Sequence, residues 1–470
     1  MEYFCAMLKI KFGTDGWRAI IAQEYTVENV ARVTQAVCDW LKKDKENPHI
    51  VIGHDCRFGG ELFSEAAIKV FCTNGVKVTT HKGFVSTPMV SFSTKSHGAD
   101  QGIVITASHN PPSYNGYKLK AAHGGPTSPQ HIKEVEDLIP DHVVEVKGDL
   151  NEFEKAGLLV YEDLEKEYLD YIKDRFDIKA LNDSHIKLGY DAMYGAGQRV
   201  MKKLFPNAML LNCERNPLFN HTAPEPLHKN LLEFSEVMAN SEELKYGFAN
   251  DGDADRIALY NGKGEYIDSH HIILLLIHYL NKYKKMSGKV AIAASTSLRV
   301  NKMCEQYGLE CEVTPVGFKH ISELMSKEDV LVGGEESGGI AVKGHIPERD
   351  GIYDGILLYE FMQETGKTID ELIQEVYEVV GSFYYHRNDK KIPNELKLAA
   401  IEKCKSGIES FGKYKVEEEI TIDGFKYKLE NDCWCMVRAS GTEPLLRIYA
   451  EGNNKEECMD ILKAVEETIL

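Results

Sequence analysis

The stretch GIVITASHNPPSYNGYK, which spans Gly102–Lys118, changes abruptly from an apolar segment to a polar loop. Its first residues are apolar and mostly β-branched, a composition typical of a buried strand. Ser108 and His109 follow, and Pro111 and Pro112 restrict the backbone just beyond them. Ligands of open α/β sheets bind beyond the carboxyl ends of strands, so this loop is a candidate functional site.

The same transition from strand to unusual loop recurs twice. A strand predicted over YGFAN (246–250) leads into DGDADR, and a strand predicted over DVLVGG (329–334) leads into EESGG. Strand and helix signals alternate up to about residue 383, which predicts three related α/β domains with mixed, mostly parallel sheets. Since no single domain holds a complete site, we expect one active site, assembled in a central cleft.

The last part of the chain has a different pattern. From about Tyr384, grouped strands, including a hairpin predicted around Asp423 and Gly424, are flanked by helices. This order is typical of a smaller α+β domain. We place the four domains at residues 1–155, 156–267, 268–383 and 384–470.

Composition excludes several classes of function. The chain has 55 Lys+Arg and 73 Asp+Glu, a net charge of −18 that disfavours binding to nucleic acid and to anionic membranes. The apolar run Ile272–Ile277 is too short to cross a bilayer, and we expect a buried helix with Asp268 or Ser269 as its N-cap. With 11 scattered cysteines and no signal peptide, the sequence predicts reduced thiols and a cytoplasmic location.

The DGDADR segment carries three aspartates with one residue between each pair. Asp251, Asp253 and Asp255 can converge on one divalent cation if the glycine-containing loop is tight. A calcium-binding EF-hand requires Gly at loop position 6 and Glu at position 12, where this chain has Arg256 and Gly262. The residues fit Mg²⁺ better, because that ion keeps open positions for phosphate oxygens. The alternative is a solvated acidic turn.

The segment RASGTEP lies between two predicted strands. It combines the guanidinium of Arg438 with the hydroxyls of Ser440 and Thr442 and the backbone N–H of Gly441. Such a set suits a phosphate dianion, and a plain hairpin with a solvated arginine is the alternative. Two further glycine-rich segments, GGEESGG (333–339) and FGTDGWR (12–18), are weaker signals, which surface turns would also explain.

Ser108 allows two chemical interpretations. A hydrolase nucleophile is disfavoured, because GxSxG is absent and a triad histidine is rarely the sequence neighbour of its serine. A serine that carries a phosphoryl group is the alternative, and it needs a cation that the aspartate loop can supply.

Taken in order, these loops resemble the α-D-phosphohexomutases, the phosphoglucomutase/phosphomannomutase family. TASHNPPSYNGYK resembles the family's phosphoserine loop, NDGDADR its magnesium loop, GEESGG its sugar-binding loop and RASGTEP its phosphate-binding loop, and FGTDGWR resembles its N-terminal motif. The resemblance covers nearly the whole chain. It implies an intramolecular phosphotransferase that interconverts hexose 1-phosphate and hexose 6-phosphate, through a hexose 1,6-bisphosphate that is both intermediate and activator.

The resemblance also implies roles for individual residues. Phospho-Ser108 would donate its phosphoryl group, with Mg²⁺ held by the three aspartates and a phosphate oxygen. Lys118 would transfer a proton, Arg18 and Arg256 would steady the phosphoryl group, and His109 would hydrogen-bond near it. The implied substrate-binding residues are Glu335 and Ser337 for the sugar hydroxyls, Arg438, Ser440, Gly441 and Thr442 for the non-reacting phosphate, and Lys319 in TPVGFK, which is otherwise a solvated lysine at a helix start.

Substrate preference is the open part of the resemblance. Gly339 stands where many phosphomannomutases and phosphoglucosamine mutases have histidine, and Ala19 stands where glycine is usual. Glu336 and TPVGFK favour glucose phosphates, whereas Thr106 disfavours glucosamine phosphates. A phosphomannomutase or phosphoglucosamine mutase is the alternative, and a non-catalytic sugar-phosphate binder is a third. We expect small sugar phosphates as partners, no nucleic acid or membrane, and a monomer or homodimer.

Overall fold

The computed structural model describes residues 8–13, 16–439 and 445–470 of the chain. Contacts between residues divide the chain into two units. Unit 1 comprises Met1–Ser269, Ser322–Asp329 and Ser337–Ile369, and unit 2 comprises His270–Ile321, Val330–Glu336 and Asp370–Leu470. The chain therefore passes between the units several times, and the loop that follows Gly334 is divided between them.

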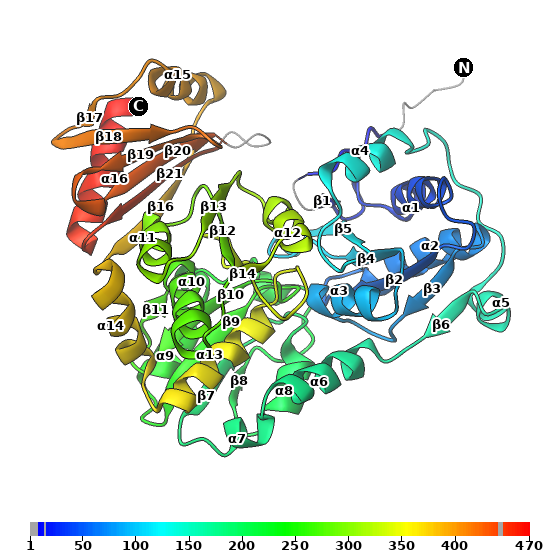
Figure 1. The fold of residues 1–470 in the computed structure, drawn as a ribbon. Helices are drawn as coiled ribbons and strands as arrows, with labels where there is room; N and C mark the ends of the chain where they lie inside the picture. The colour runs from blue at the N-terminus through cyan, green and yellow to red at the C-terminus, as the bar shows by residue number, and fades with distance from the viewer. Residues whose placement is uncertain (1–7, 14–15, 440–444) are drawn as a thin grey trace. The chain divides into compact units, whose positions relative to one another are not determined.

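The first sheet of unit 1 has six strands in the order β1-β5-β4-β2-β3-β6 (Figure 1). Strands β4, β2, β3 and β6 run parallel, whereas β5 pairs antiparallel with both β4 and β1. The strands are β1 (Trp17–Ile20), β2 (His49–His54), β3 (Lys77–Thr80), β4 (Gln101–Ile105), β5 (Tyr114–Ala121) and β6 (Leu159–Tyr161). The antiparallel β5 carries the chain from the Ser108 loop directly back along β4.

Helices cover both faces of this sheet, because its central strands are apolar on both sides. Ile50 and Ile52 of β2 pack into one core with α1 and α2, and helix α3 contacts the same sheet through β2 and β4. The Thr26 side chain caps α1 by accepting the backbone N–H of Asn29. The helices of this region are α1 (Val27–Leu41), α2 (Gly60–Thr73), α3 (Thr87–Ser96), α4 (Pro129–Asp137), α5 (Leu150–Lys155), α6 (Leu164–Arg175) and α7 (Ile178–Asn182).

The second sheet of unit 1 has five strands in the order β11-β10-β9-β7-β8. Strands β9, β7 and β8 run parallel, and β10 returns antiparallel to β9. Helix α13, which is capped by Asp350, packs against β9 and β10. The elements are β7 (Lys187–Asp191), α8 (Gln198–Leu204), β8 (Met209–Leu211), α9 (Leu232–Ala239), β9 (Leu244–Asn250), β10 (Ile257–Asn261), β11 (Tyr266–Ile267) and α13 (Gly351–Thr365). Strand β15 (Ile340–Val342) is also in unit 1 but is not part of this sheet.

Unit 2 begins with a parallel arrangement in which β12 pairs with both β13 and β14. Its elements are α10 (Ser269–His278), β12 (Lys289–Ala293), α11 (Leu298–Tyr307), β13 (Cys311–Thr314), β14 (Val330–Gly334) and α14 (Ile369–Val380). Helix α12 (Phe318–Lys327) is divided between the two units after Ile321. The run Ile272–Ile277 lies inside α10 and is fully buried, as the sequence predicted. Within the described residues, no helix is both long and apolar enough to cross a membrane.

The C-terminal part of unit 2 is an antiparallel six-stranded sheet in the order β16-β21-β20-β19-β18-β17 (Figure 1). Helices α15 and α16 share one core with this sheet. The elements are β16 (Tyr384–Lys391), α15 (Asn394–Lys405), β17 (Ser410–Phe411), β18 (Tyr414–Ile420), β19 (Phe425–Leu429), β20 (Trp434–Ala439), β21 (Leu445–Gly452) and α16 (Lys455–Ile469). The predicted fold class, α/β layers followed by a smaller α+β domain, is confirmed.

Candidate active site

Ser108 lies just beyond the carboxyl end of β4 and is 1% exposed. Its φ of 50° places it in the left-handed region, which costs a non-glycine residue about 1–2 kcal/mol. Its hydroxyl donates to Oδ2 of Asp251 over 2.7 Å and lies 3.3 Å from Nδ1 of His109. Strained backbone of this kind persists only where the surroundings hold it in place.

The buried guanidinium of Arg57 holds this loop. Its Nη2 donates to the carbonyl oxygens of Ser108 and Asn110, and its Nη1 donates to those of Pro111 and Tyr114. Four main-chain acceptors on one rigid, planar group restrict the path of the loop on both sides of the two prolines.

Asp55 and Thr106 complete this support. The carboxylate of Asp55 lies 3.3 Å from Nε of Arg57 and accepts a hydrogen bond of 2.6 Å from the Thr106 hydroxyl. The Thr106 oxygen in turn accepts the N–H of Ser108 over 2.8 Å. Burial raises the pKa of Asp55 to about 6, although Arg57 and the Thr106 hydroxyl act in the opposite direction.

The three aspartates of the predicted cation loop converge in unit 1. Asp251, Asp253 and Asp255 are fully buried, and each offers a carboxylate oxygen within 4.8 Å of the other two. Oδ1 of Asp251 accepts the backbone N–H of Asp255 and of Arg256, which closes the loop. Ala254 adopts a φ of 60° inside this turn.

One oxygen of Asp253 and one of Asp255 are held by neighbouring side chains. Oδ2 of Asp253 accepts from the Thr87 hydroxyl over 2.6 Å and lies 2.9 Å from Nζ of Lys118. The same Nζ lies 3.0 Å from Oδ2 of Asp255. Oδ1 of Asp253 and of Asp255 is buried without a hydrogen-bond partner among the described residues.

This donor set fits a hard divalent cation. Burial and the two neighbouring carboxylates raise the pKa of Asp251. Burial alone would raise the pKa of Asp253 as well, but Lys118 and Thr87 hold it below its usual value. Concentrated negative charge with two unpartnered carboxylate oxygens is what a bound Mg²⁺ would compensate.

The remaining predicted residues of unit 1 lie around Ser108. Arg18 donates to Oδ1 of Asn110 over 2.7 Å, and Nη1 of Arg256 lies 3.8 Å from the carboxylate of Glu225. Burial and nearby cations, Arg256 and Arg18 among them, lower the pKa of His109 well below its usual value. His109 is therefore a neutral hydrogen-bonding neighbour of Ser108.

In unit 2, Glu335 of the predicted sugar loop and Arg438 of the predicted phosphate loop are both connected to the segment 316–317. Glu335 accepts the N–H of Gly317 over 3.0 Å. The guanidinium of Arg438 is paired with the carboxylate of Asp423 at 3.2 Å from each oxygen, and Asp423 also accepts the N–H of Val316 over 3.0 Å. The segment 316–317 is thereby joined to both loops.

Of the five remaining predicted residues, the structure describes two, Lys319 and Ser337. Lys319 lies in the first turn of α12, and Ser337 lies in the turn before β15, in unit 1. Ser440, Gly441 and Thr442 lie outside the described residues.

Comparison with known proteins identifies the family. Models of phosphoglucomutase/phosphomannomutase domains match in the order I, II, III and C-terminal domain, over residues 9–143, 166–264, 268–380 and 390–468. The chain belongs to the phosphoglucomutase/phosphomannomutase family. The resemblance inferred from the loops is confirmed, and the protein is a phosphohexomutase, an enzyme of the isomerase and phosphotransferase type.

The relatives of this chain are named for different sugar phosphate substrates. A phosphoglucomutase/phosphomannomutase of Thermococcus kodakarensis is 30% identical over 96% of both chains. A phosphoglucosamine mutase of Bacillus pumilus is 29% identical over 95% of both chains. The crystal structure of a putative phosphomannomutase from Thermus thermophilus superposes with a TM-score of 0.87 at 31% identity and covers 98% of this chain and 99% of its own.

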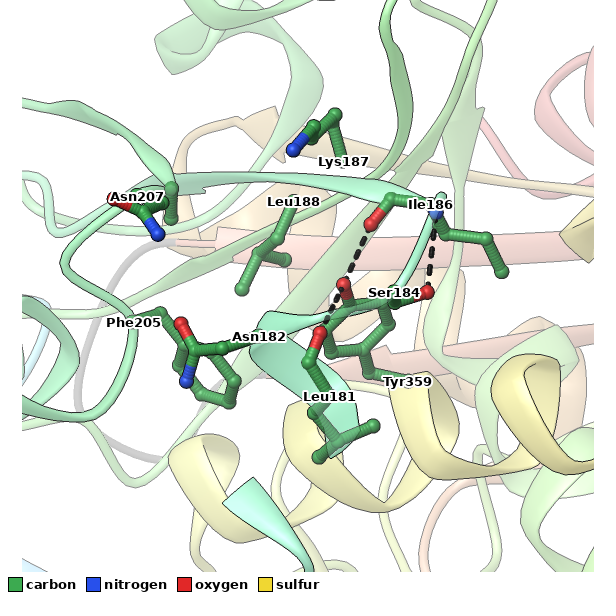
Figure 2. A pocket seen from close by; sticks show the side chains of 10 residues that line it. Leu181, Asn182, Ser184, Ile186, Lys187, Leu188, Phe205, Asn207 and Tyr359 are labelled. Atoms are coloured by element: carbon green, nitrogen blue, oxygen red, sulfur yellow. Dashed lines mark hydrogen bonds between the residues drawn. The ribbon is translucent and has the colours of Figure 1, made fainter. Parts of the chain in front are cut away.

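A separate pocket of this phosphohexomutase, shown in Figure 2, lies between α7, β7 and α13. The Tyr359 hydroxyl donates to the carbonyl oxygens of Leu181 and Ile186, and the Ser184 hydroxyl accepts the N–H of Ile186. The cavity volume is about 20 Å³, which is room for about one water. We therefore interpret it as a packing defect.

Several residues of the mutase site escaped the sequence analysis. Arg57, Thr87 and Arg349 all contact the Ser108 loop or the aspartates, yet none lies in a loop whose composition indicates a site. The available signal was the pair Asp55 and Arg57, which follows directly after strand β2. Thr87 and Arg349 gave no local signal, because only the tertiary fold brings them to Asp253 and Asp255.

Proposed function

We propose that this phosphohexomutase interconverts glucose 1-phosphate and glucose 6-phosphate, through phospho-Ser108 and a glucose 1,6-bisphosphate intermediate. The observation that carries the proposal is the 2.7 Å hydrogen bond from Ser108 Oγ to Asp251, in a buried loop of three carboxylates. A phosphoryl group on Oγ would stand at the edge of this loop.

The three aspartates would hold Mg²⁺ together with one oxygen of the Ser108 phosphate. When bound, Mg²⁺ supplies positive charge that draws negative charge away from the transferring group. Thr87 and Lys118 keep the second oxygens of Asp253 and Asp255 occupied, so the free oxygens are available for the cation. Arg18 and Arg256 add positive charge beside the Ser108 loop, while neutral His109 supplies a hydrogen bond.

In phosphoryl transfer, the protein contributes mainly by positioning the reacting groups and by stabilising their charge. The bond between phosphorus and Ser108 Oγ breaks as a bond from phosphorus to a sugar hydroxyl oxygen forms. We assign Lys118, whose Nζ is paired with Asp253 and Asp255, as the proton-transfer group. It gives a proton to Ser108 Oγ as this oxygen leaves phosphorus, and takes the proton of the sugar hydroxyl in its place. In the second half, the other phosphate of the bisphosphate returns to Ser108, with the proton moving in the opposite direction.

The loops of unit 2 would recognise the sugar and its second phosphate. Glu335, with Ser337, would accept hydrogen bonds from sugar hydroxyls, and Lys319 would lie at the entrance of the same loop region. The non-reacting phosphate would bind to Arg438 together with Ser440, Gly441 and Thr442. Arg438 is preorganised for this role by its pairing with Asp423.

Glucose phosphate is the substrate that we favour, because the chain has Glu336 and TPVGFK and lacks a histidine at Gly339. A phosphoglucosamine or phosphomannose mutase is the second candidate. The names of relatives at 28–30% identity support it, since several are phosphoglucosamine mutases. We also propose a cytoplasmic location, which fits the free thiols of all described cysteines.

The decisive experiment compares the three sugars. The protein is incubated with Mg²⁺, a trace of glucose 1,6-bisphosphate, and the 1-phosphate of glucose, mannose or glucosamine, and kcat/KM is measured for each. We expect glucose 1-phosphate to give the largest kcat/KM and Ser108→Ala to be inactive with all three. A larger value for either other sugar would replace the proposed substrate, and conversion equal to that of Ser108→Ala would contradict the mechanism.

A further inference from the structure

Arg349 contacts the aspartate loop from the segment that precedes helix α13. It is 4% exposed, and its Nη2 lies 2.7 Å from Oδ2 of Asp255. The same oxygen lies 3.0 Å from Nζ of Lys118. One oxygen of Asp255 therefore lies against two cationic groups, while the other is buried without a hydrogen-bond partner among the described residues.

Arg349 is held in place by Glu348, which forms a buried ion pair with Lys120. Nζ of Lys120 lies 2.6 Å from Oε2 of Glu348, and both side chains are fully buried. Oε1 of Glu348 accepts the backbone N–H of Arg349 over 3.1 Å and lies 3.4 Å from its Nε. Because each member of this chain is fixed by the next, the guanidinium has little freedom to leave Asp255.

Gly339 provides the space that Arg349 needs. A Cβ atom added at Gly339 would lie 2.3 Å from Cδ and 3.1 Å from Cγ of Arg349. Gly339 does not have the positive φ that favours glycine. The constraint at this position is instead steric, because Cγ and Cδ of Arg349 occupy the space that a Cβ would need. The side chain of a histidine at this position would meet the same atoms of Arg349.

We propose that Arg349 is a positioning residue for the cation site, and that Gly339 is the paired position that lets it reach Asp255. The proposal rests on the proposed cation site. Arg349 and Lys118 together occupy Oδ2 of Asp255, so Oδ1 would be available to a bound cation. Supporting contacts of this kind typically change metal affinity by about 10–100-fold when they are removed.

The test measures Mn²⁺ binding to the full-length protein, by the electron paramagnetic resonance signal of free Mn²⁺ and by titration calorimetry. All variants are brought to one phosphorylation state, which is checked by intact mass. We expect Arg349→Ala to bind Mn²⁺ at least about 10-fold more weakly and Arg349→Lys to recover part of this loss. The control is Arg175→Ala, which removes an arginine that donates to the Tyr353 hydroxyl, and it should bind as the wild type does.

A double-mutant cycle isolates the contact between the two positions. Gly339→Ala should weaken Mn²⁺ binding several-fold in the wild-type background and have no effect in the Arg349→Ala background, where the clash is gone. Equal effects in both backgrounds would overturn the pairing. The cycle and Arg349→Lys remain informative even if the stability of Arg349→Ala is reduced, because thermal unfolding of each variant is recorded alongside.

The outcomes separate this inference from the proposed function. If wild type binds Mn²⁺ and Asp253→Asn does not, the cation site stands, and unchanged affinity in Arg349→Ala then overturns the role of Arg349 alone. If wild type itself fails to bind Mn²⁺, the cation site and this inference are both overturned.

Discussion

The Ser108 hydroxyl donates to Oδ2 of Asp251 over 2.7 Å, although 143 residues separate the two along the chain. Each residue follows a strand of a mostly parallel sheet, β4 for Ser108 and β9 for Asp251. The carboxyl ends of two different sheets therefore meet in one place, where a phosphoryl group on the serine and a cation on the aspartates would be neighbours.

Replacing Ser108 tests its assigned role as phosphoryl carrier. Ser108→Ala should reduce kcat by at least about 10³-fold with every sugar phosphate, because no oxygen remains to accept the phosphoryl group. Intact mass after incubation with glucose 1,6-bisphosphate should show one added phosphoryl group on wild type and none on the variant. Ser96→Ala, at the end of α3, is the control, and an added group on Ser108→Ala would contradict the assignment.

Arg57 should control the position of the serine. Arg57→Met removes the donor to four loop carbonyls and leaves Asp55 buried without its cation. Loss of one partner of a buried pair costs roughly 3–5 kcal/mol, and displacement of a reacting group by about 1 Å costs about 10²-fold in rate. We expect a lower Tm and kcat but nearly unchanged Mn²⁺ affinity. Arg215→Met, which removes an exposed ion pair with Glu61, is the control.

Asp55 should give stability a recognisable dependence on pH. Its pKa is raised to about 6 in the folded protein by burial, against an ordinary value of 3.8. Between these values the folded protein binds a proton that the unfolded chain has released, so this group makes folding less favourable as pH rises through the window, and its cost is complete above about pH 7.

Asp55→Asn removes that titration. The Tm of wild type minus that of the variant should therefore decrease from about pH 4 to about pH 6 and level off above about pH 7. Thermal unfolding followed by circular dichroism at several pH values measures this difference. A difference that is constant, or that grows with pH, would contradict the raised pKa.

Arg299 should attach the C-terminal sheet to helix α11 within unit 2. Its guanidinium donates to the carbonyl of Val380 over 2.7 Å and to Oδ1 of Asn453 over 2.8 Å, and it lies 3.6 Å from the buried carboxylate of Glu451. Arg299→Met should weaken this junction by roughly 3 kcal/mol, because Glu451 stays buried without a nearby guanidinium.

Hydrogen exchange measures the effect of Arg299→Met. Amides of β21 and of the segment after Val380 should exchange faster than in wild type, while those of β2 and β4 in unit 1 should be unchanged. Lys302→Met, which removes an exposed partner of Asp432, is the matched control. Unchanged exchange in β21 would contradict the role of Arg299.

The candidate site was predictable where its chemistry is local in the sequence. Ser108 follows a short β-branched strand, and three aspartates alternate within five residues, so spacing alone indicates a serine loop and a cation loop. The strand and helix pattern and the hairpin at Asp423 were predictable for the same reason. These features depend on neighbours a few residues away.

The sequence by itself determined the fold class, the order of the loops and the residue types that each loop presents. Only the tertiary structure decided which oxygens of Asp253 and Asp255 lack a hydrogen-bond partner among the described residues, because Thr87, Lys118 and Arg349 reach these carboxylates from distant parts of the chain. The tertiary structure also shows that a side chain at residue 339 would clash with the aliphatic part of the Arg349 side chain. Periodicity and spacing record local geometry, whereas burial and ion pairing depend on which segments the fold brings together.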